Sequence, residues 1–157
     1  MLGRTYDAQN CSAARTLEIV GERWSLLIIR DALFRGFSRY SEFERSLGIA
    51  PNMLASRLAW FVETGLMKTS PVSEGSGVSE YLLTEMGKDL GGVVVALTAW
   101  GDRWAAPEGP PIIYEHQDCG GTVSPVIKCQ SCSGELKPEG LFVRPGPGAR
   151  RSSKMSE

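Results

Sequence analysis

The sequence predicts a mainly α-helical domain with a small β-hairpin, followed by a short C-terminal β segment that carries potential metal ligands. Three observations support this prediction. Apolar residues recur at helical spacing through most of the first 105 residues, two short β-prone runs flank a stretch rich in Ser and Gly near residue 75, and three of the four cysteines follow residue 111. The 157 residues are 42% apolar, which is enough to form one ordinary core and a small appendage.

Two helices are predicted in the first 35 residues. Apolar residues at helical spacing run from Leu17 to Phe34 and are interrupted near Gly21, where the two helices should part. The first helix should begin near Ser12, because a serine hydroxyl can cap the free N–H groups of a first turn.

A second pair of helices is predicted around a three- or four-residue turn. Residues 40–47 have the spacing of a short helix, which Gly48 can end by adopting the left-handed conformation. Pro51 suits the first position of the next helix, which we expect to run to about Thr64.

A β-hairpin and a long helix complete the predicted main domain. The β-prone runs 66–72 and 78–84 are separated by Ser-Glu-Gly-Ser-Gly, which indicates a hairpin with a flexible tip. The long helix spans about residues 90–104 and has a broader apolar face than a 105-residue domain needs.

Two short helices joined by a tight turn and followed at once by a hairpin predict a winged helix-turn-helix domain. In this architecture a helix enters the DNA major groove and the hairpin lies along the backbone or the minor groove. On the second helix of the pair, Asn52 and Ser56 fall on the outer face of the first turns, where side chains normally meet base edges. Basic residues nearby are better placed to contact phosphates. The candidate DNA-binding residues are Arg39, Pro51, Asn52, Ser56, Arg57, Lys68 and Ser76.

Charge and composition restrict the other classes of function. The formal net charge is −1, so DNA binding must depend on a local patch. The longest uncharged run, residues 90–101, falls short of the roughly 20 residues that span a bilayer. The N-terminal stretch lacks the apolar core of a secretory signal, so we expect a cytoplasmic protein with reduced thiols. With no Gly-rich phosphate loop and no Ser-centred nucleophile elbow in the sequence, we expect no enzyme activity.

Two pairs of potential metal ligands lie after a Pro/Gly-rich stretch. In each pair two residues separate the ligands and a glycine follows, which is the spacing of two knuckles that converge on one tetrahedral zinc ion. Residues 121–126 and 136–143 would be the strands of this zinc-ribbon-like segment, and a bound metal would compensate for its small apolar core. The predicted ligands are His116, Cys119, Cys129 and Cys132.

Two other interpretations of this segment stay open. Cys129 and Cys132 have the spacing of a thiol-disulfide switch, and a metal-free hairpin would also accommodate the same residues. We therefore divide the chain into a main domain over residues 1–105, a linker over 106–111, the Cys/His segment over 112–143 and a disordered tail over 144–157. The tail carries Arg150, Arg151 and Lys154.

The main domain is similar to the HxlR-type family of bacterial winged-helix regulators, a branch close to the MarR family. The matching stretches are residues 22–30 (ERWSLLIIR), 36–43 (GFSRYSEF), 47–54 (LGIAPNML), 57–58 (RL), 65–66 (GL) and 78–84 (VSEYLLT), with Cys11 and Gly87. The resemblance implies a homodimer that binds palindromic operator DNA and regulates transcription, with the first and last helices of the main domain at the dimer interface. The sequence departs from the family at the wing tip, which is small and acidic, so the wing should add little affinity.

The resemblance also bears on regulation. Cys11 matches a cysteine that senses oxidants or electrophiles in some members of the family, and Arg15 nearby could favour its thiolate; the alternative is a small hydrophobic residue at a helix start. A small-molecule effector could occupy apolar space between the long helix and the DNA-binding part. A second class of function, a winged-helix adaptor that binds protein and no specific DNA, is favoured by the near-neutral charge and the weak wing.

Overall fold

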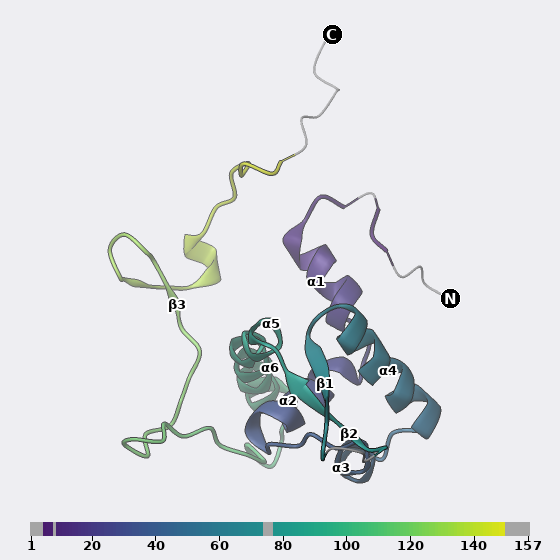
Figure 1. Ribbon diagram of the computed structural model, residues 1–157. Helices are drawn as coiled ribbons and strands as arrows, with labels where there is room; N and C mark the ends of the chain where they lie inside the picture. Colours follow the sequence, from purple (N-terminus) through teal and green to yellow (C-terminus); the bar gives the residue numbers. More distant parts are fainter. Residues whose placement is uncertain (1–4, 8, 74–76, 150–157) are drawn as a thin grey trace.

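The computed structural model describes residues 5–7, 9–73 and 77–149 (Figure 1). Within these residues no helix is long and apolar enough to cross a bilayer. The main-domain elements, in chain order, are α1 (Ser12–Val20), α2 (Ser25–Phe34), α3 (Tyr40–Leu47), α4 (Pro51–Glu63), β1 (Met67–Pro71), β2 (Ser79–Leu83), α5 (Glu85–Lys88) and α6 (Gly91–Trp104).

The apolar residues that predicted these helices form one core around α2. Helices α3, α4 and α6 pack on or near α2, and the base of the β1–β2 hairpin closes the same core. The predicted helix pairs, their break near Gly21, the hairpin and the long helix are confirmed. The apolar side chains with the least exposure are Ile28, Ile29, Phe43, Leu54, Leu58, Phe61, Leu66 and Met67.

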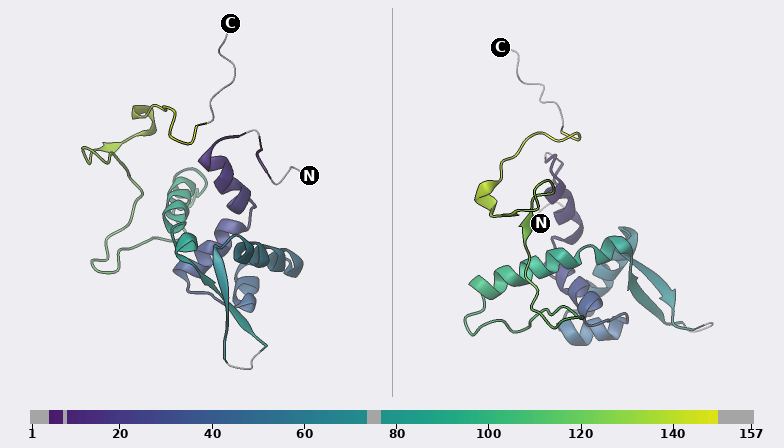
Figure 2. Two further views of the ribbon diagram at one scale, coloured as in Figure 1. Left: turned by 45° about the horizontal axis from the view of Figure 1, so that its top comes forward. Right: turned by 90° about the vertical axis from the view of Figure 1, so that its left-hand side faces the viewer.

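The hairpin projects away from the helices, as the right-hand view in Figure 2 shows. Its strands are antiparallel, and the register runs from Met67 opposite Leu83 to Pro71 opposite Ser79. The one-turn helix α5 was not predicted, because four residues are too few to show a period. Its N-cap is Thr84, whose hydroxyl donates to the Gly65 carbonyl over 2.6 Å, so α5 is fixed to the base of the hairpin.

Helix α1 begins at Ser12 as predicted, but Ser12 does not cap it. The N-cap residue is Cys11, which is extended at φ −140° and ψ 129°, and no side-chain hydrogen bond caps the helix there. Ser12 is already the first helical residue, so its hydroxyl is one position too late to cap the first turn.

The Cys/His segment contains much shorter strands than the sequence predicted. Instead of strands at 121–126 and 136–143, it has an isolated bridge between Glu115 and Thr122, and a hairpin of β3 (Ile127–Lys128) and β4 (Glu135–Leu136) followed by a 3-10 turn at Pro138–Gly140. Two features explain the difference: the turns use their hydrogen bonds locally, and most side chains after residue 106 are exposed. Residues 144–149 contain no regular helix or strand, and the rest of the predicted tail lies outside the described residues.

Candidate nucleic-acid interface

A three-residue turn presents the first turn of α4 to solvent. Gly48 is left-handed at φ 58° and reverses the chain, and Ile49 is buried in the core. Ala50 is extended and acts as the N-cap, so α4 begins at Pro51 as predicted. The buried Ile49 therefore anchors this turn to the core and fixes the direction of α4.

The two predicted base-reading residues are exposed on α4. Asn52 and Ser56 are about one helical turn apart, and both lie on the face opposite the buried Leu54 and Leu58. The Asn52 side-chain oxygen accepts the backbone N–H of Met53 over 2.9 Å, which restrains the amide at the start of the helix. The outer face of α4 is therefore free of core packing at its first two turns.

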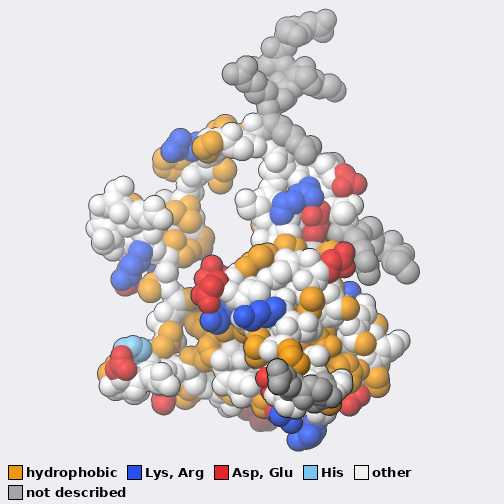
Figure 3. All heavy atoms as spheres, viewed as in Figure 1, with side chains coloured by type: hydrophobic (Ala, Val, Ile, Leu, Met, Phe, Trp, Pro, Cys, Tyr) orange, Lys and Arg blue, Asp and Glu red, His pale blue; other side chains and the backbone are white. Residues whose placement is uncertain are grey.

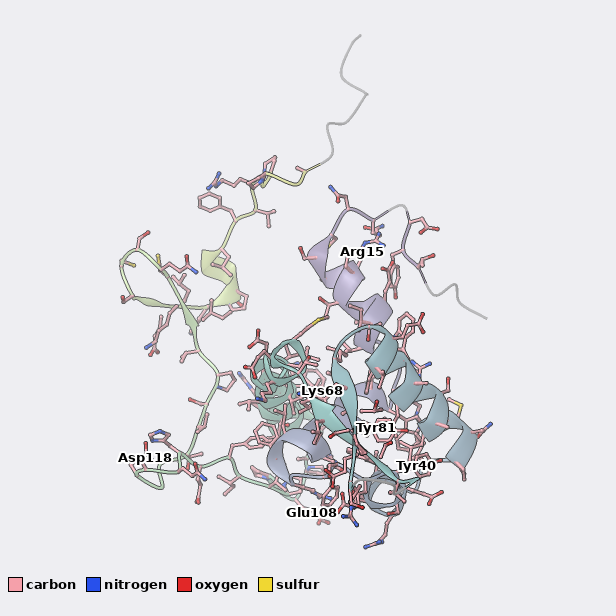
Figure 4. All side chains as sticks on the ribbon, in the orientation of Figure 1. Arg15, Tyr40, Lys68, Tyr81, Glu108 and Asp118 are labelled. Carbon is pink, nitrogen blue, oxygen red and sulfur yellow. The ribbon has the colours of Figure 1, made fainter. Side chains whose placement is uncertain are left out.

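Tyr40 contributes to this site, a role that the helical spacing of residues 40–47 does not show. Its hydroxyl donates to the Pro51 carbonyl over 2.7 Å, so the first residue of α3 holds the first turn of α4 (Figure 4). Desolvation, with smaller effects of Glu44 and Tyr81, raises the pKa of Tyr40, which keeps the hydroxyl protonated as a donor. The sequence signal for this role was a tyrosine at the start of the helix-turn-helix, where its ring packs against the core.

Helix α3 is capped and tied to the wing. The Glu42 carboxylate accepts the backbone N–H groups of Ser38 over 2.9 Å and Arg39 over 2.8 Å, and these bonds lower the pKa of Glu42. The Ser38 carbonyl accepts the N–H of Tyr81 in β2 over 2.7 Å. The turn before α3 is therefore joined directly to the hairpin by this hydrogen bond.

Two of the predicted phosphate contacts lie on exposed positions beside α4. Arg39 is half exposed, with its Nε 3.6 Å from the Glu80 carboxylate of β2. Lys68 is exposed on β1 opposite Leu82 (Figure 4). Ser76, the predicted contact at the hairpin tip, lies outside the described residues.

Arg57 has a different environment from the other candidates. Only 13% of its side chain is exposed, and its Nε lies 4.0 Å from the Glu22 carboxylate in the α1–α2 connection. That Nε is buried, and within the described residues it has no hydrogen-bond partner. Helical periodicity places Arg57 beside Leu58 but cannot show that a distant turn covers it.

Charge around these elements is mixed. Figure 3 shows Lys and Arg side chains interspersed with Asp and Glu side chains on the face it presents, in keeping with the net charge of −1. Any phosphate contact therefore depends on individual basic residues and not on one broad basic field.

Comparison with known proteins identifies the family. The sequence profile of the HxlR-like helix-turn-helix family matches residues 19–109. The chain belongs to this family. It is 44% identical over 138 residues to Rv3095 of Mycobacterium tuberculosis, named an uncharacterized HTH-type transcriptional regulator, and the match covers 87% of each chain. The HxlR-like region ends at residue 109, whereas the alignment with Rv3095 spans 138 residues. The similarity to Rv3095 therefore continues beyond this region into the Cys/His segment.

Solved structures support the same assignment. The structure of PA1607, assigned as a transcription factor, has a TM-score of 0.77 at 36% identity, covering 86% of this chain and 94% of that one. The redox regulator HypR in its reduced form has a TM-score of 0.54 at 26% identity, covering 59% of this chain and 92% of that one. PA1607 thus resembles this HxlR-type chain beyond the helix-turn-helix domain, whereas the match to HypR spans a part about as long as that domain.

Cys11 is exposed at the start of α1 in this HxlR-type chain. The nearby backbone N–H groups of Ala14 and Ala13, in the first turn of α1, lower the pKa of its thiol. Arg15, expected to favour the thiolate, instead donates to the Glu18 carboxylate over 2.7 and 2.8 Å. The first turn of the helix, and not Arg15, therefore makes this cysteine acidic.

The structure does not bring the four predicted metal ligands together. Across the described ranges, no group of three or more His, Cys, Asp or Glu residues is placed to hold a metal ion. His116 and Cys119 form one close pair, with Nδ1 3.3 Å from Sγ. In the second pair, hydrogen bonds from the backbone of Cys132 and Ser131 and from the Cys132 side chain lower the pKa of the Cys129 thiol.

A small apolar cavity of about 120 Å³ lies between α1 and α5, and not along the long helix where an effector was expected. It is lined by Thr16, Ile19, Val20, Leu66, Met86 and Leu90. This volume is well below the roughly 300 Å³ at which ligand pockets usually begin, so a larger effector would require the helices to move apart.

Proposed function

We propose that this HxlR-type protein is a sequence-specific DNA-binding transcriptional regulator that inserts α4 into the major groove. The observation that carries the proposal is the exposed first turn of α4, held by Tyr40 and presented by the three-residue turn beside the projecting hairpin. A helix fixed at its N-terminus with an unpacked outer face fits the groove-reading role of a recognition helix. The names of its relatives support the same class of function.

The candidate residues divide between two roles. Asn52 can pair with adenine through both the oxygen and the nitrogen of its side-chain amide, and Ser56 can contact a base or a phosphate one turn later. Arg39 and Lys68 are exposed and would bind phosphates, which sets the position of the protein and adds affinity without sequence information. Because Arg57 is largely covered and lies near Glu22, we assign it to positioning α4 against the α1–α2 connection.

A homodimer is the assembly that this surface favours. Large apolar side chains on α1 and α6 are exposed to solvent in one chain, which is costly unless another surface covers them. A second copy would cover them symmetrically, and two α4 helices related by a two-fold axis would bind a palindromic operator. These side chains are Leu17, Val93, Leu97, Trp100 and Trp104.

Redox control through Cys11 is a further part of the proposal. Its thiol is exposed and acidified at the start of α1, the helix that would join the dimer interface, and the HypR relative is named a redox regulator. Oxidation there should change operator affinity in the native protein, and Cys11→Ser should abolish that response while the reduced protein still binds DNA. An equal response in the Cys11→Ser variant would contradict this part.

Two substitutions test the division of roles on an operator duplex and a scrambled duplex. Asn52→Ala should lower affinity for the operator by about 5- to 100-fold, the value of one lost bidentate base contact, and leave binding to the scrambled duplex unchanged. Arg39→Ala should weaken both and reduce the salt dependence of binding. Lys88→Ala removes an equally exposed charge on α5 and serves as the control. Equal losses on both duplexes for Asn52→Ala would contradict base reading.

The alternative function is a winged-helix adaptor that binds another protein. The near-neutral net charge of −1 favours this alternative. A DNA affinity that falls steeply as the salt concentration rises would support the regulator. A protein that binds no duplex even at low salt would support the adaptor.

A further inference from the structure

We propose that the Cys/His segment binds one structural zinc ion per chain through His116, Cys119, Cys129 and Cys132. The proposal depends on a repeated structure within the segment and not on the DNA-binding function. The two halves, around His116–Cys119 and Cys129–Cys132, fold into the same turn. We call them the first and second knuckle.

The first knuckle is closed by two backbone hydrogen bonds around its ligand pair. The N–H of His116 donates to the Gly121 carbonyl over 2.8 Å, and the N–H of Gly120 donates back to the His116 carbonyl over 2.8 Å. These bonds wrap the backbone around the side chain of Cys119. A Cβ atom at Gly121 would stand 3.3 Å from the Cys119 sulfur, so glycine leaves room for that sulfur.

The second knuckle repeats these bonds 13 residues later. The N–H of Cys129 donates to the Gly134 carbonyl over 2.9 Å, and the N–H of Ser133 donates back to the Cys129 carbonyl over 2.9 Å. A Cβ atom at Gly134 would again stand 3.3 Å from the sulfur of Cys132. Each ligand pair therefore lies in a turn of the same hydrogen-bond pattern with glycine at the same position.

Backbone conformation and strand register repeat as well. The fifth residue of each knuckle is left-handed, with φ 68° at Gly120 and 58° at Ser133, and Ser133 is the one non-glycine residue with positive φ in the described ranges. The residue before each knuckle pairs with the residue after its glycine, at the Glu115–Thr122 bridge and at Lys128–Glu135. A serine in this strained conformation indicates that the shape of the turn is required.

The first knuckle already holds its two donors at metal-binding separation. Nδ1 of His116 lies 3.3 Å from Sγ of Cys119. Two such donors on one tetrahedral zinc ion, with bonds of about 2.0 and 2.3 Å, are separated by about 3.5 Å. The other ring nitrogen, Nε2, lies 3.5 Å from the Asp118 carboxylate, while Nδ1 lies beside the Cys119 sulfur, as expected of a histidine ligand held by a neighbouring carboxylate. Asp118 is thus a positioning residue (Figure 4).

Closure of the site requires only that the two knuckles meet. Nine residues separate Cys119 from Cys129, and the side chains on both sides are mostly exposed, so little packing opposes the movement. Three thiolates and one imidazole would complete a closed tetrahedral set, which suits a structural ion. Such an ion would stabilise a segment that lacks a core of its own.

Metal content and cobalt binding of the full-length protein test this proposal. We expect one zinc ion per chain after purification under reducing conditions. The metal-depleted protein should bind one cobalt(II) ion per chain, with thiolate-to-cobalt charge-transfer bands and the visible bands of a tetrahedral site. No stoichiometric metal and no cobalt spectrum would overturn the proposal, as would one ion shared between two chains.

Variants separate this site from other thiols. Cys119→Ser and Cys129→Ser should each abolish stoichiometric binding, and Asp118→Asn should weaken cobalt binding by about 10-fold. Cys11→Ser removes a thiol in the other domain and should change nothing. Far-UV circular dichroism checks that the helices persist in every variant. A cobalt spectrum that survives Cys119→Ser would overturn the four-ligand site.

Discussion

Asp31 is the most deeply buried charged side chain of the core and ties α2 to α3. Its carboxylate accepts Nε of Arg30 over 2.8 Å and the Ser46 hydroxyl over 2.6 Å. Arg35 adds a longer contact of 3.6 Å from an exposed position. Because α3 supports the turn to α4, this polar cluster helps to fix the orientation of the candidate DNA-reading helix.

Removal of this carboxylate should destabilise the domain strongly. Asp31→Ala removes the acceptor for the Arg30 guanidinium and the Ser46 hydroxyl, so we expect the free energy of unfolding to fall by about 3 kcal/mol. Arg35→Ala is the matched control, and its half-exposed contact should contribute less than about 1 kcal/mol. Urea denaturation measures both values, and equal effects would show that Asp31 is not the centre of the cluster.

The cap of α3 predicts a pH dependence. The backbone N–H groups of Arg39 and Ser38 lower the folded-state pKa of Glu42 below its ordinary value of 4.5. The stabilising contribution of the carboxylate is therefore complete above about 4.5 and is lost as pH falls through the folded-state pKa. Glu42→Gln should lower the melting temperature near neutral pH, and this difference should shrink on acidification.

Thermal unfolding of the native protein and Glu42→Gln at a series of pH values measures this effect. Glu85→Gln is the control, because the Glu85–Lys88 pair is exposed on α5 and should contribute little. A difference for Glu42→Gln that stays constant from neutral to acidic pH would contradict the role of the charged carboxylate.

Among the elements, α5 joins the hairpin to α6 through a contact that only glycine permits. A Cβ atom at Gly87 would collide with the Leu66 carbonyl oxygen at the base of β1. At Gly92, in the first turn of α6, a Cβ atom would meet open space. These two glycines therefore form a matched pair for one substitution.

Alanine at the two positions should have opposite effects. Gly87→Ala should destabilise the protein by about 2 kcal/mol because the backbone at α5 and β1 must separate. Gly92→Ala should stabilise it by about 0.5 to 1 kcal/mol through the higher helix propensity of alanine. Thermal or urea unfolding measures the stability of both variants. A Gly87→Ala variant as stable as Gly92→Ala would show that the contact between Gly87 and the Leu66 carbonyl is looser than described.

The sequence predicted elements well where periodicity was long and turn residues were distinctive. Gly48 and Pro51 located the turn and the start of α4, and the spacing of apolar residues predicted α2, α4 and α6. Sequence spacing could not show that Glu22 lies near Arg57, because that contact joins residues 35 positions apart. It also could not show the strand positions around Cys129, where local turn bonds and not apolar alternation set the structure.

For the whole molecule, the exposed face of α6 predicts self-association. Trp100→Glu should raise the dissociation constant of the dimer by at least about 10-fold, since a buried tryptophan is a typical centre of interface energy. Phe142→Glu alters a side chain that is 93% exposed outside α6 and is the control. Sedimentation at several protein concentrations measures both, and a dimer unaffected by Trp100→Glu would place the interface elsewhere.

We propose that α4, presented by the α3–α4 turn, reads DNA sequence. Selection of bound sequences from a random duplex pool by the purified full-length protein tests this role most directly. We expect an enriched palindrome whose half-sites lie about one helical turn, roughly 10 base pairs, apart. No enrichment at low salt by a folded protein would contradict DNA recognition and would favour a protein partner for the winged-helix domain.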